Sequence, residues 1–581
     1  MEKEKNPVIS KRLKELSGYR KHVLAASPEE MLDTILDYHQ PAALVHSFPA
    51  EDFHLLIHDI GLADSLPLLK LASGKQWEYL FDIEVWQKDR LCYHEITGWL
   101  ERLLAADPVR LSKWCYEEKV DFIELFLFRN IEVRIREDDQ SPSDMGNGFF
   151  SDDETFYVRL RDYPVSDESE KKIKQKRNQV LTRLLQALSR YDHVRYQGLL
   201  LEAAAMIPAE TEEALFRLRN VRLSEKGFLP FHEAIGVYQP IKVEEIKARG
   251  KKRLADQPDQ VFMPPVPSYA KGMLDDDNLF SRSLKSIENT AVVLQLQTEF
   301  AGLCNQVISA DQITLKSRSH LNAVVGKVSG YLSMGLEELM KGKKKGRRFH
   351  GASLIETCFL SDIFRIGYGM VLKLKWEADK WRKESWFQEK GLPLSFWGEA
   401  WLGVLGGLLL EKPQYFQNDL SNGLYRDFQT LKEVADAASV LETIKAFDAI
   451  FSLMDCSVEN FKNNPLFFYK NFLLTLWAGS QPEIKVAEFK KMGPIPLDRF
   501  RIFFETLWET GPSSRLIGNT AKEAFLTWLA GVTGLDEYLI SRQIGNALES
   551  LFEEVEDALA DVSVHHLDHR FIHLFLLTDP G

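Results

Sequence analysis

Helix-start signals followed by apolar residues at helical spacing are the features of this sequence that most constrain its fold. In "SPEEMLDTILDYH", Ser27 precedes Pro28, and Glu30 follows three residues after the serine, which is the pattern of a capping box with proline in the first helical turn. Asp107-Pro108 opens a second segment in the same way. Near the C-terminus, apolar residues trace one face of a long amphipathic helix: Leu539, Ile540, Ile544, Leu548, Leu551, Phe552, Val555 and Leu559. These signals predict a mostly α-helical protein.

The N-terminal part contains an internal repeat. A shift of 24 residues places the following apolar residues on one another: Leu44 and Val45 on Leu68 and Leu69, and Phe53, Leu55, Leu56 and Ile57 on Trp77, Tyr79, Leu80 and Phe81. A repeat of this length fits short helical hairpins that stack as a small solenoid. The sequence therefore predicts a solenoid-like helical-hairpin domain over residues 1–130.

One region departs from the helical pattern. The stretches "NIEVRIRE" (130–137) and "TFYVRLRD" (155–162) alternate apolar and polar residues, which is the period of a half-buried strand. The segment from Glu137 to Glu154 has seven carboxylates and neither Lys nor Arg. We predict a β-ribbon with a long acidic loop over residues 131–165, followed by a helical continuation over 166–240.

The second half of the chain again carries helix signals. A stretch rich in proline and charge predicts an interdomain linker over residues 241–278. We expect a large helical C-terminal domain over residues 279–581. Its first part holds five tryptophans that would pack in a core or line an aromatic pocket, with core packing favoured: Trp376, Trp381, Trp386, Trp397 and Trp401.

Charge and cysteine content exclude several classes of protein. The formal net charge of −13 disfavours a nucleic-acid partner, and the basic run at 341–348 is the only candidate contact for one. The five cysteines are dispersed and form no CxxC pair, which fits a reducing cytoplasm. The most apolar run, 400–410, is about half the length of a bilayer-spanning helix. We predict a cytoplasmic protein without a membrane span.

Familiar catalytic templates are incomplete in this sequence. "HEITG" (94–98) and "HEAIG" (232–236) begin like zinc-protease helices but have glycine where the second histidine is required. The Gly74-Lys75 pair lacks the preceding glycine and the following Ser or Thr of a phosphate-binding loop, and no GxSxG elbow is present. No catalytic and no cofactor-binding residue is predicted. The incomplete templates argue against an enzyme, and an enzyme with another kind of active site stays an alternative.

Two stretches offer metal ligands. In the acidic loop, Asp152, Asp153 and Glu154 form the densest carboxylate group, which would suit Mg²⁺ or Ca²⁺; the alternative is a solvated loop. In "SVHHLDHRFIHLFLL", a helix would place four histidines within one arc, and His565 and His569 would chelate a transition metal as an i, i+4 pair. The alternative is a polar stripe that faces solvent or a partner, because a structural site needs a third and a fourth ligand.

Two resemblances add expectations. Residues 28–105, which include "QPAALVHSFPAEDFHLLIHDIGLADSLPLL", resemble the intracellular N-domain of magnesium-transporter proteins and the flagellar motor-switch helical superfamily. The first of these families implies acidic magnesium ligands at domain interfaces, and none of them is placed on a position of this chain. The stretches "KGFLPFHEAIGVYQPI", "GLYRDFQTLKEVADA", "FLLTLWA" and "LDHRFIH" resemble an uncharacterised helical family of deltaproteobacteria. That resemblance implies a fold and no activity.

Three functional hypotheses follow. The first is a non-catalytic interaction or regulatory protein that presents helical grooves to a protein partner. The second is a divalent-cation sensor with Mg²⁺ as the ion, based on the transporter resemblance and the acidic loop. The third is an enzyme with an unrecognised helical active site in the Trp-rich region, which a pocket lined by Trp and perturbed carboxylates would favour.

Overall fold

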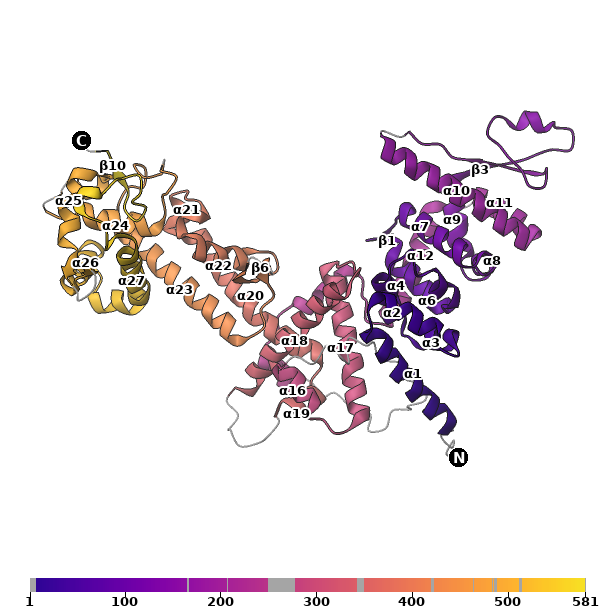
Figure 1. Ribbon diagram of the computed structural model, residues 1–581, viewed down its shortest axis with the longest axis horizontal. Coiled ribbons are helices and arrows are strands. Elements are labelled where there is room, and N and C mark those ends of the chain that lie inside the picture. Colours follow the sequence, from indigo (N-terminus) through magenta and orange to yellow (C-terminus); the bar gives the residue numbers. More distant parts are fainter. Residues whose placement is uncertain are drawn as a thin grey trace. The chain divides into compact units, whose positions relative to one another are not determined.

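The computed structural model of the chain is mostly helical, as the sequence predicts (Figure 1). It describes residues 7–579 except 165–166, 206, 249–276, 342–349, 420–422, 463, 483, 485–487 and 511–514. In the described part, each sheet has two strands. None of the described helices combines the length and the apolarity that crossing a bilayer requires.

The described residues fall into two compact units. The first takes residues from 1–239, 244–332 and 342–364, and the second takes residues from 240–243, 333–341 and 365–581. Residues 279–332 therefore group with the N-terminal part of the chain, whereas the predicted C-terminal domain begins at 279. Most of the predicted linker lies outside the described residues, and its first part forms α14 (Val243–Ala248).

One long helix and several short ones open the first unit. They are α1 (Pro7–Ala25), α2 (Pro28–Leu36), α3 (Pro41–Ser47), α4 (Ala50–Ile60), α5 (Leu66–Leu71) and α6 (Gly74–Glu84). The predicted start of α2 is confirmed, because the backbone N–H of Ser27 donates to Glu30 Oε2 at 3.2 Å. From α1 to α5, each helix contacts the helix two places further along the chain (Figure 1).

The internal repeat corresponds to two successive helix pairs. α4 begins at Ala50 and α6 at Gly74, which is the 24-residue shift seen in the sequence. Phe53 and its counterpart Trp77 are both fully buried. The other matched pairs are also buried, and all of them except Leu55 and Tyr79 belong to one core cluster. The same apolar pattern is therefore used twice against a common core.

The predicted β-ribbon is confirmed. β3 (Ile131–Ile135) pairs antiparallel with β4 (Phe156–Leu160), with Val133 opposite Val158. The ribbon follows β1 (Trp86–Gln87), β2 (Arg90–Leu91), α7 (Tyr93–Ala106), α8 (Pro108–Glu117) and α9 (Val120–Asn130). The start of α8 was also predicted, and the Asp107 carboxylate accepts the N–H of Arg110 at 3.0 Å.

Helices complete the first unit. They are α10 (Glu168–Tyr191), α11 (His193–Ala205), α12 (Pro208–Ser224), α13 (Phe231–Ala234), α16 (Leu279–Lys285), α17 (Thr290–Asp311) and α19 (His350–Thr357), with the 3₁₀ turn η2 (Ile235–Tyr238) after α13. Two further helices, α18 (Arg318–Met340) and α20 (Leu360–Glu384), contribute residues to both units. The basic run at 341–348 lies outside the described residues except for Lys341.

The second unit is also mainly helical. Its elements after α20 are α21 (Trp386–Glu389), η4 (Leu394–Trp397), α22 (Glu399–Leu409), β5 (Tyr415–Asp419), β6 (Gly423–Arg426), α23 (Leu431–Leu453), α24 (Tyr469–Gly479), η5 (Phe489–Lys491), β7 (Ile495–Pro496), α25 (Leu497–Thr506), β8 (Trp508–Thr510), β9 (Arg515–Ile517), α26 (Asn519–Thr533), α27 (Glu537–Leu559), η6 (Val564–His566) and β10 (Leu577–Thr578). The predicted apolar face of α27 is buried except at Leu539, which is 38% exposed.

Most of the Trp-rich stretch packs into the core of this unit, which is the favoured interpretation. Trp397 is fully buried, and its ring centroid lies 5.9 Å from that of Trp381. Trp386 is also buried and lies beside Phe451 at 5.3 Å. Trp401 is half-buried, and Trp376 has 51% of its surface exposed.

Candidate metal centre

Two histidines on α4 and one glutamate on α6 converge in the first unit. Phe53 and Ile57 are fully buried and fix the core-facing side of α4. His54 and His58 each follow one of these residues, so both imidazoles project from a neighbouring side of the helix, one turn apart. Glu84 is the last residue of α6, a helix that packs against α4. Helix periodicity thus pairs the histidines, and the packing of α4 on α6 brings the carboxylate to them.

The three side chains meet at a single oxygen atom. His54 Nε2 lies 2.6 Å from Glu84 Oε1, and His58 Nε2 lies 2.8 Å from the same oxygen. The exposed fractions of these side chains are 1% for His54, 10% for His58 and 6% for Glu84. Within the described part of the chain, this is the only group of three or more His, Cys, Asp or Glu residues whose ligand atoms all lie within 4.8 Å of one another.

The protonation state of the cluster suits a metal ion. Burial would raise the pKa of Glu84, but hydrogen bonds from His54 and His58 outweigh it and lower the pKa to about 2. Burial lowers the pKa of His54 despite the neighbouring carboxylate. At neutral pH the cluster therefore holds an ionised carboxylate that accepts N–H groups from both imidazoles. A metal ion would replace these hydrogen bonds and bind the Nε2 lone pairs, with the imidazole protons on Nδ1.

Carboxylates that flank the cluster are paired with their own cations. Glu51 Oε1 lies 2.9 Å from Lys226 Nζ, and Asp59 Oδ2 lies 2.5 Å from Arg318 Nε. Asp82 accepts two hydrogen bonds from Arg222, at 2.7 and 2.8 Å. Because these acids are neutralised locally, the convergent ligand set consists of His54, His58 and Glu84.

The predicted acidic site has a different geometry. Asp153 Oδ1 accepts the backbone N–H groups of Thr155 and Phe156 at 3.0 and 2.8 Å, and its Oδ2 accepts Gln197 Nε2 at 2.8 Å. Asp152 and Glu154 are exposed. Asp153 thus organises the turn into β4, and cation binding by these three residues stays a prediction.

The predicted helix through the C-terminal histidines is wrong. α27 ends at Leu559, and after the 3₁₀ turn η6 the chain has no helix up to β10. Hydrogen bonds from Leu576 N to Thr475 Oγ1 and from Ile495 N to Leu576 O hold this end of the chain extended. His565 is exposed, while His569 Nδ1 lies 3.5 Å from Asp579 Oδ1. The helical i, i+4 geometry that would pair His565 with His569 is absent, and a metal at these residues stays a prediction.

Sequence reasoning missed the α4 pair although a signal was present. "FHLLIHDI" carries two histidines at i, i+4 within a segment of clear helical character. Glu84 has no such local signal, because only the packing of α6 on α4 brings it close to the histidines.

Comparison with known proteins places the chain in a family without assigning an activity. Residues 8–578 match the model of a family of unknown function, DUF6178. The chain belongs to the DUF6178 family. This agrees with the sequence analysis, in which the chain resembles an uncharacterised helical family without an assigned activity. No curated protein and no solved structure matches the DUF6178 chain, so the likeness of residues 28–105 to transporter and motor-switch domains stays a prediction.

Proposed function

We propose that this DUF6178 protein is a metal-dependent regulatory protein whose N-terminal helices bind a divalent transition metal through His54, His58 and Glu84. The observation that carries the proposal is the convergence of two imidazole nitrogens and one carboxylate oxygen in a nearly buried place. Three protein ligands leave a position for water or for a further ligand.

The ligand set selects the class of ion. Magnesium and calcium prefer oxygen ligands only, whereas imidazole suits Zn²⁺, Fe²⁺, Co²⁺ and Ni²⁺. The proposal therefore replaces the magnesium-sensing hypothesis with a transition-metal hypothesis. It also moves the site from the acidic loop to α4 and α6.

The helical architecture supports a regulatory role. The succession of contacts between helices two places apart is what stacked helical hairpins would make, and such stacks present extended surfaces to protein partners. A metal held between α4 and α6 would tie one helix pair to the next. All five cysteines are unpaired, which supports a reducing compartment such as the cytoplasm.

The enzyme hypothesis has weaker support. In the Trp-rich region, burial raises the pKa of Asp448, and hydrogen bonds to backbone N–H groups oppose that rise. Its carboxylate accepts the N–H groups of Trp386 and Phe387 at 3.2 and 2.9 Å, so it caps the start of α21. A capping role accounts for this buried acid without any catalytic function.

A metal titration tests the proposal. Tag-free protein is stripped with a chelator, and thermal unfolding is followed with Zn²⁺, Co²⁺, Mn²⁺ or Mg²⁺. We expect a rise of several degrees with Zn²⁺ or Co²⁺ and none with Mg²⁺, because an ion present at a hundredfold excess over its Kd stabilises the folded state by about 2.7 kcal/mol. Bound Co²⁺ also reports its coordination through its visible absorption.

Matched variants locate the response. We expect Glu84→Gln and His58→Ala to abolish both the thermal shift and the Co²⁺ spectrum, and the exposed control His566→Ala to keep both. The double variant His565→Ala/His569→Ala tests the C-terminal stretch separately. A response that persists in Glu84→Gln and His58→Ala, or the absence of any response in the unmodified protein, contradicts the proposal.

A further inference from the structure

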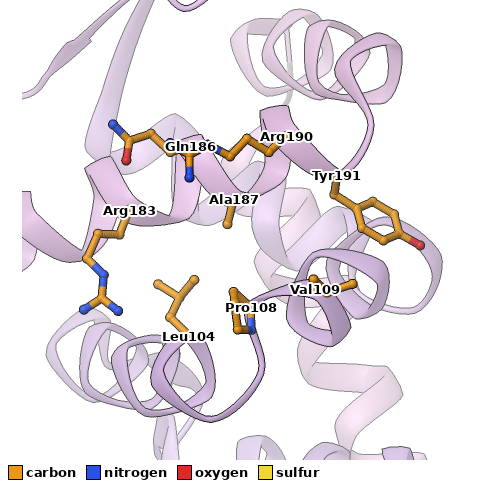
Figure 2. A pocket seen from close by; sticks show the side chains of 8 residues that line it. All are labelled: Leu104, Pro108, Val109, Arg183, Gln186, Ala187, Arg190 and Tyr191. Carbon is orange, nitrogen blue, oxygen red and sulfur yellow. The ribbon is translucent and has the colours of Figure 1, made fainter.

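A cavity of about 580 Å³ lies between α10 and the junction of α7 with α8 (Figure 2). Its volume is within the range of about 300–1,000 Å³ that is typical of small-molecule sites. It belongs to the first unit and shares no residue with the histidine cluster. The side chains that line it are Leu104, Pro108, Val109, Arg183, Gln186, Ala187, Arg190 and Tyr191.

One side of the cavity is apolar and firmly held. Leu104 is buried, whereas Val109 leaves 65% of its surface exposed. At the end of α10, Tyr191 stacks on Tyr116 of α8 with ring centroids 6.1 Å apart, and Tyr116 Oη donates to the carbonyl oxygen of Leu188 at 3.0 Å. These contacts fix α10 against α8. Leu104 is the only buried residue of the lining and six of the eight lining residues are exposed, so the site is an open surface pocket.

The other side of the cavity carries cationic groups. Arg183, Gln186 and Arg190 follow one another at i, i+3 and i+7 on α10 and therefore share one side of the helix (Figure 2). Neither arginine makes an ion pair with another residue in the described part of the chain.

Two carboxylates could pair with these arginines, one because it lines a neighbouring cavity and one because it is close in the sequence. Both already bind other groups of the chain. Glu101, which lines a neighbouring cavity with Arg183, lies 2.7 Å from Lys176 Nζ. Asp192, which follows Arg190 by two residues, accepts the N–H of Arg195 at 3.0 Å and lies 3.5 Å from the Arg195 side chain. The two guanidinium groups thus stay available to an anion from outside the chain.

We propose that this cavity binds a small organic anion whose carboxylate or phosphate group is held by Arg183 and Arg190. Guanidinium groups bind both kinds of anion through paired, charge-assisted hydrogen bonds, and Gln186 adds a neutral donor. The apolar or aromatic body of the ligand packs on Leu104, Val109 and the ring of Tyr191. The proposal is independent of metal binding at His54, His58 and Glu84.

Calorimetric titration of the full chain at constant ionic strength tests the proposal with four probes. Phenyl phosphate and phenylacetate carry both an anion and a ring, inorganic phosphate carries only the anion, and benzyl alcohol carries only the ring. We expect one or both of the first two to bind more tightly than phosphate or benzyl alcohol, and their relative affinities distinguish a phosphate ligand from a carboxylate ligand. Equal affinity for phenyl phosphate and inorganic phosphate, or binding of benzyl alcohol as tight as that of the anions, overturns the proposal.

Two variants and a control assign the binding to the cavity. We expect Arg183→Gln/Arg190→Gln to weaken binding about tenfold or more, because charge-assisted hydrogen bonds are lost. Val109→Asp places a like charge beside the ligand and should weaken binding similarly, while an acidic residue in the first turn of α8 favours the helix. The control Arg217→Gln removes an arginine that is 74% exposed on α12 and should leave binding unchanged. Unchanged affinity in the first two variants overturns the proposal. A further titration uses polyglutamate, an acidic polymer. Binding of polyglutamate without binding of the small anions also overturns the proposal.

Discussion

Two parts of this chain carry histidines four residues apart, and only one of them forms a cluster. On α4, His54 and His58 lie one helical turn apart and both contact Glu84 Oε1. Beyond α27, His565 and His569 have the same spacing on a backbone that has left the helix. The spacing brings side chains together only where the backbone is helical, so the neighbouring apolar residues decide the outcome.

The two segments differ in the spacing of their buried apolar residues, which is helical on α4 and irregular in the C-terminal segment. On α4, the fully buried apolar positions Phe53, Leu56 and Ile57 recur at helical spacing, while Leu55, which lies off this face, is 6% exposed. In the C-terminal segment, the buried positions are Leu567, Ile572, Phe575 and Leu576, which define no single helical face. Phe571, which would lie on the apolar face of the predicted helix, is 75% exposed.

Each histidine pair lies beside an acid with a low pKa, and the two pKa values are low for different reasons. Glu84 owes a pKa of about 2 to hydrogen bonds from two histidines, which outweigh its burial. Asp568 also has a pKa of about 2, chiefly because the Arg570 side chain donates to it. The side chain of Glu84 is 6% exposed and that of Asp568 is 30% exposed, so solvent screens the second pair more strongly than the first.

The largest expected contrast is the response to removal of one phenylalanine from each segment. We expect Phe53→Ala to lower the free energy of unfolding by about 3–5 kcal/mol, because the side chain is fully buried beside the histidine cluster. Phe571→Ala should change it by less than about 0.5 kcal/mol, since the ring is mostly in solvent. Urea unfolding of both variants measures the difference. Comparable losses would mean that the C-terminal segment packs as closely as α4.

The next largest effect is a pH dependence of the free energy of unfolding that Glu84 causes. Its pKa in the folded state lies below the ordinary value of 4.5, so its contribution to stability is present above that value and is lost as the pH falls from about 4.5 to about 2. The shift corresponds to about 3 kcal/mol. We expect the stability difference between the unmodified protein and Glu84→Gln to shrink over this pH window in urea unfolding. Asp568→Asn is the comparison variant: the pKa of Asp568 is also about 2, but its side chain is 30% exposed and screened by solvent, so its stability difference should change less over the same pH window. A difference for Glu84→Gln that is constant between pH 5 and pH 3 would contradict the prediction.

A third contrast concerns chemical access to the imidazoles. We expect diethyl pyrocarbonate to modify the exposed His565 and His566 at least about tenfold faster than the buried His54, because His54 reacts only after local opening. Peptide mass spectrometry at short reaction times gives the separate rates. Equal rates would show that the α4–α6 contact opens freely.

The smallest expected effect is that of removing the C-terminal pair. His565→Ala/His569→Ala should change the free energy of unfolding of the metal-free protein by less than about 0.5 kcal/mol, because His565 is exposed and the nearest carboxylate to His569 Nδ1 lies 3.5 Å away. Thermal and urea unfolding together measure the change. A loss of 2 kcal/mol or more, in the range of about 1–3 kcal/mol for a broken buried hydrogen bond, would place these histidines in a structural network.

Local signals in the sequence determined the type of most of these elements. Ser27 and Asp107 start helices where predicted, since a side-chain cap and a following proline need only the adjacent backbone. The alternation of apolar and polar residues likewise placed β3 and β4, whose strands pair across one acidic loop. The same signals failed after α27, where pairing of the chain end with β7 outweighs any local preference for helix.

The sequence by itself thus determined that the chain is helical, where many of its helices begin, and that His54 and His58 share one side of α4. The tertiary structure alone decided that Glu84 joins them, that Asp153 serves a turn, and that two unpaired arginines border one cavity on α10. Capping and periodicity act within a few residues and are legible in the sequence. The contact of α4 with α6 and that of α10 with α7 and α8 depend on burying apolar faces shared by distant segments, so the sites formed at these contacts follow from packing.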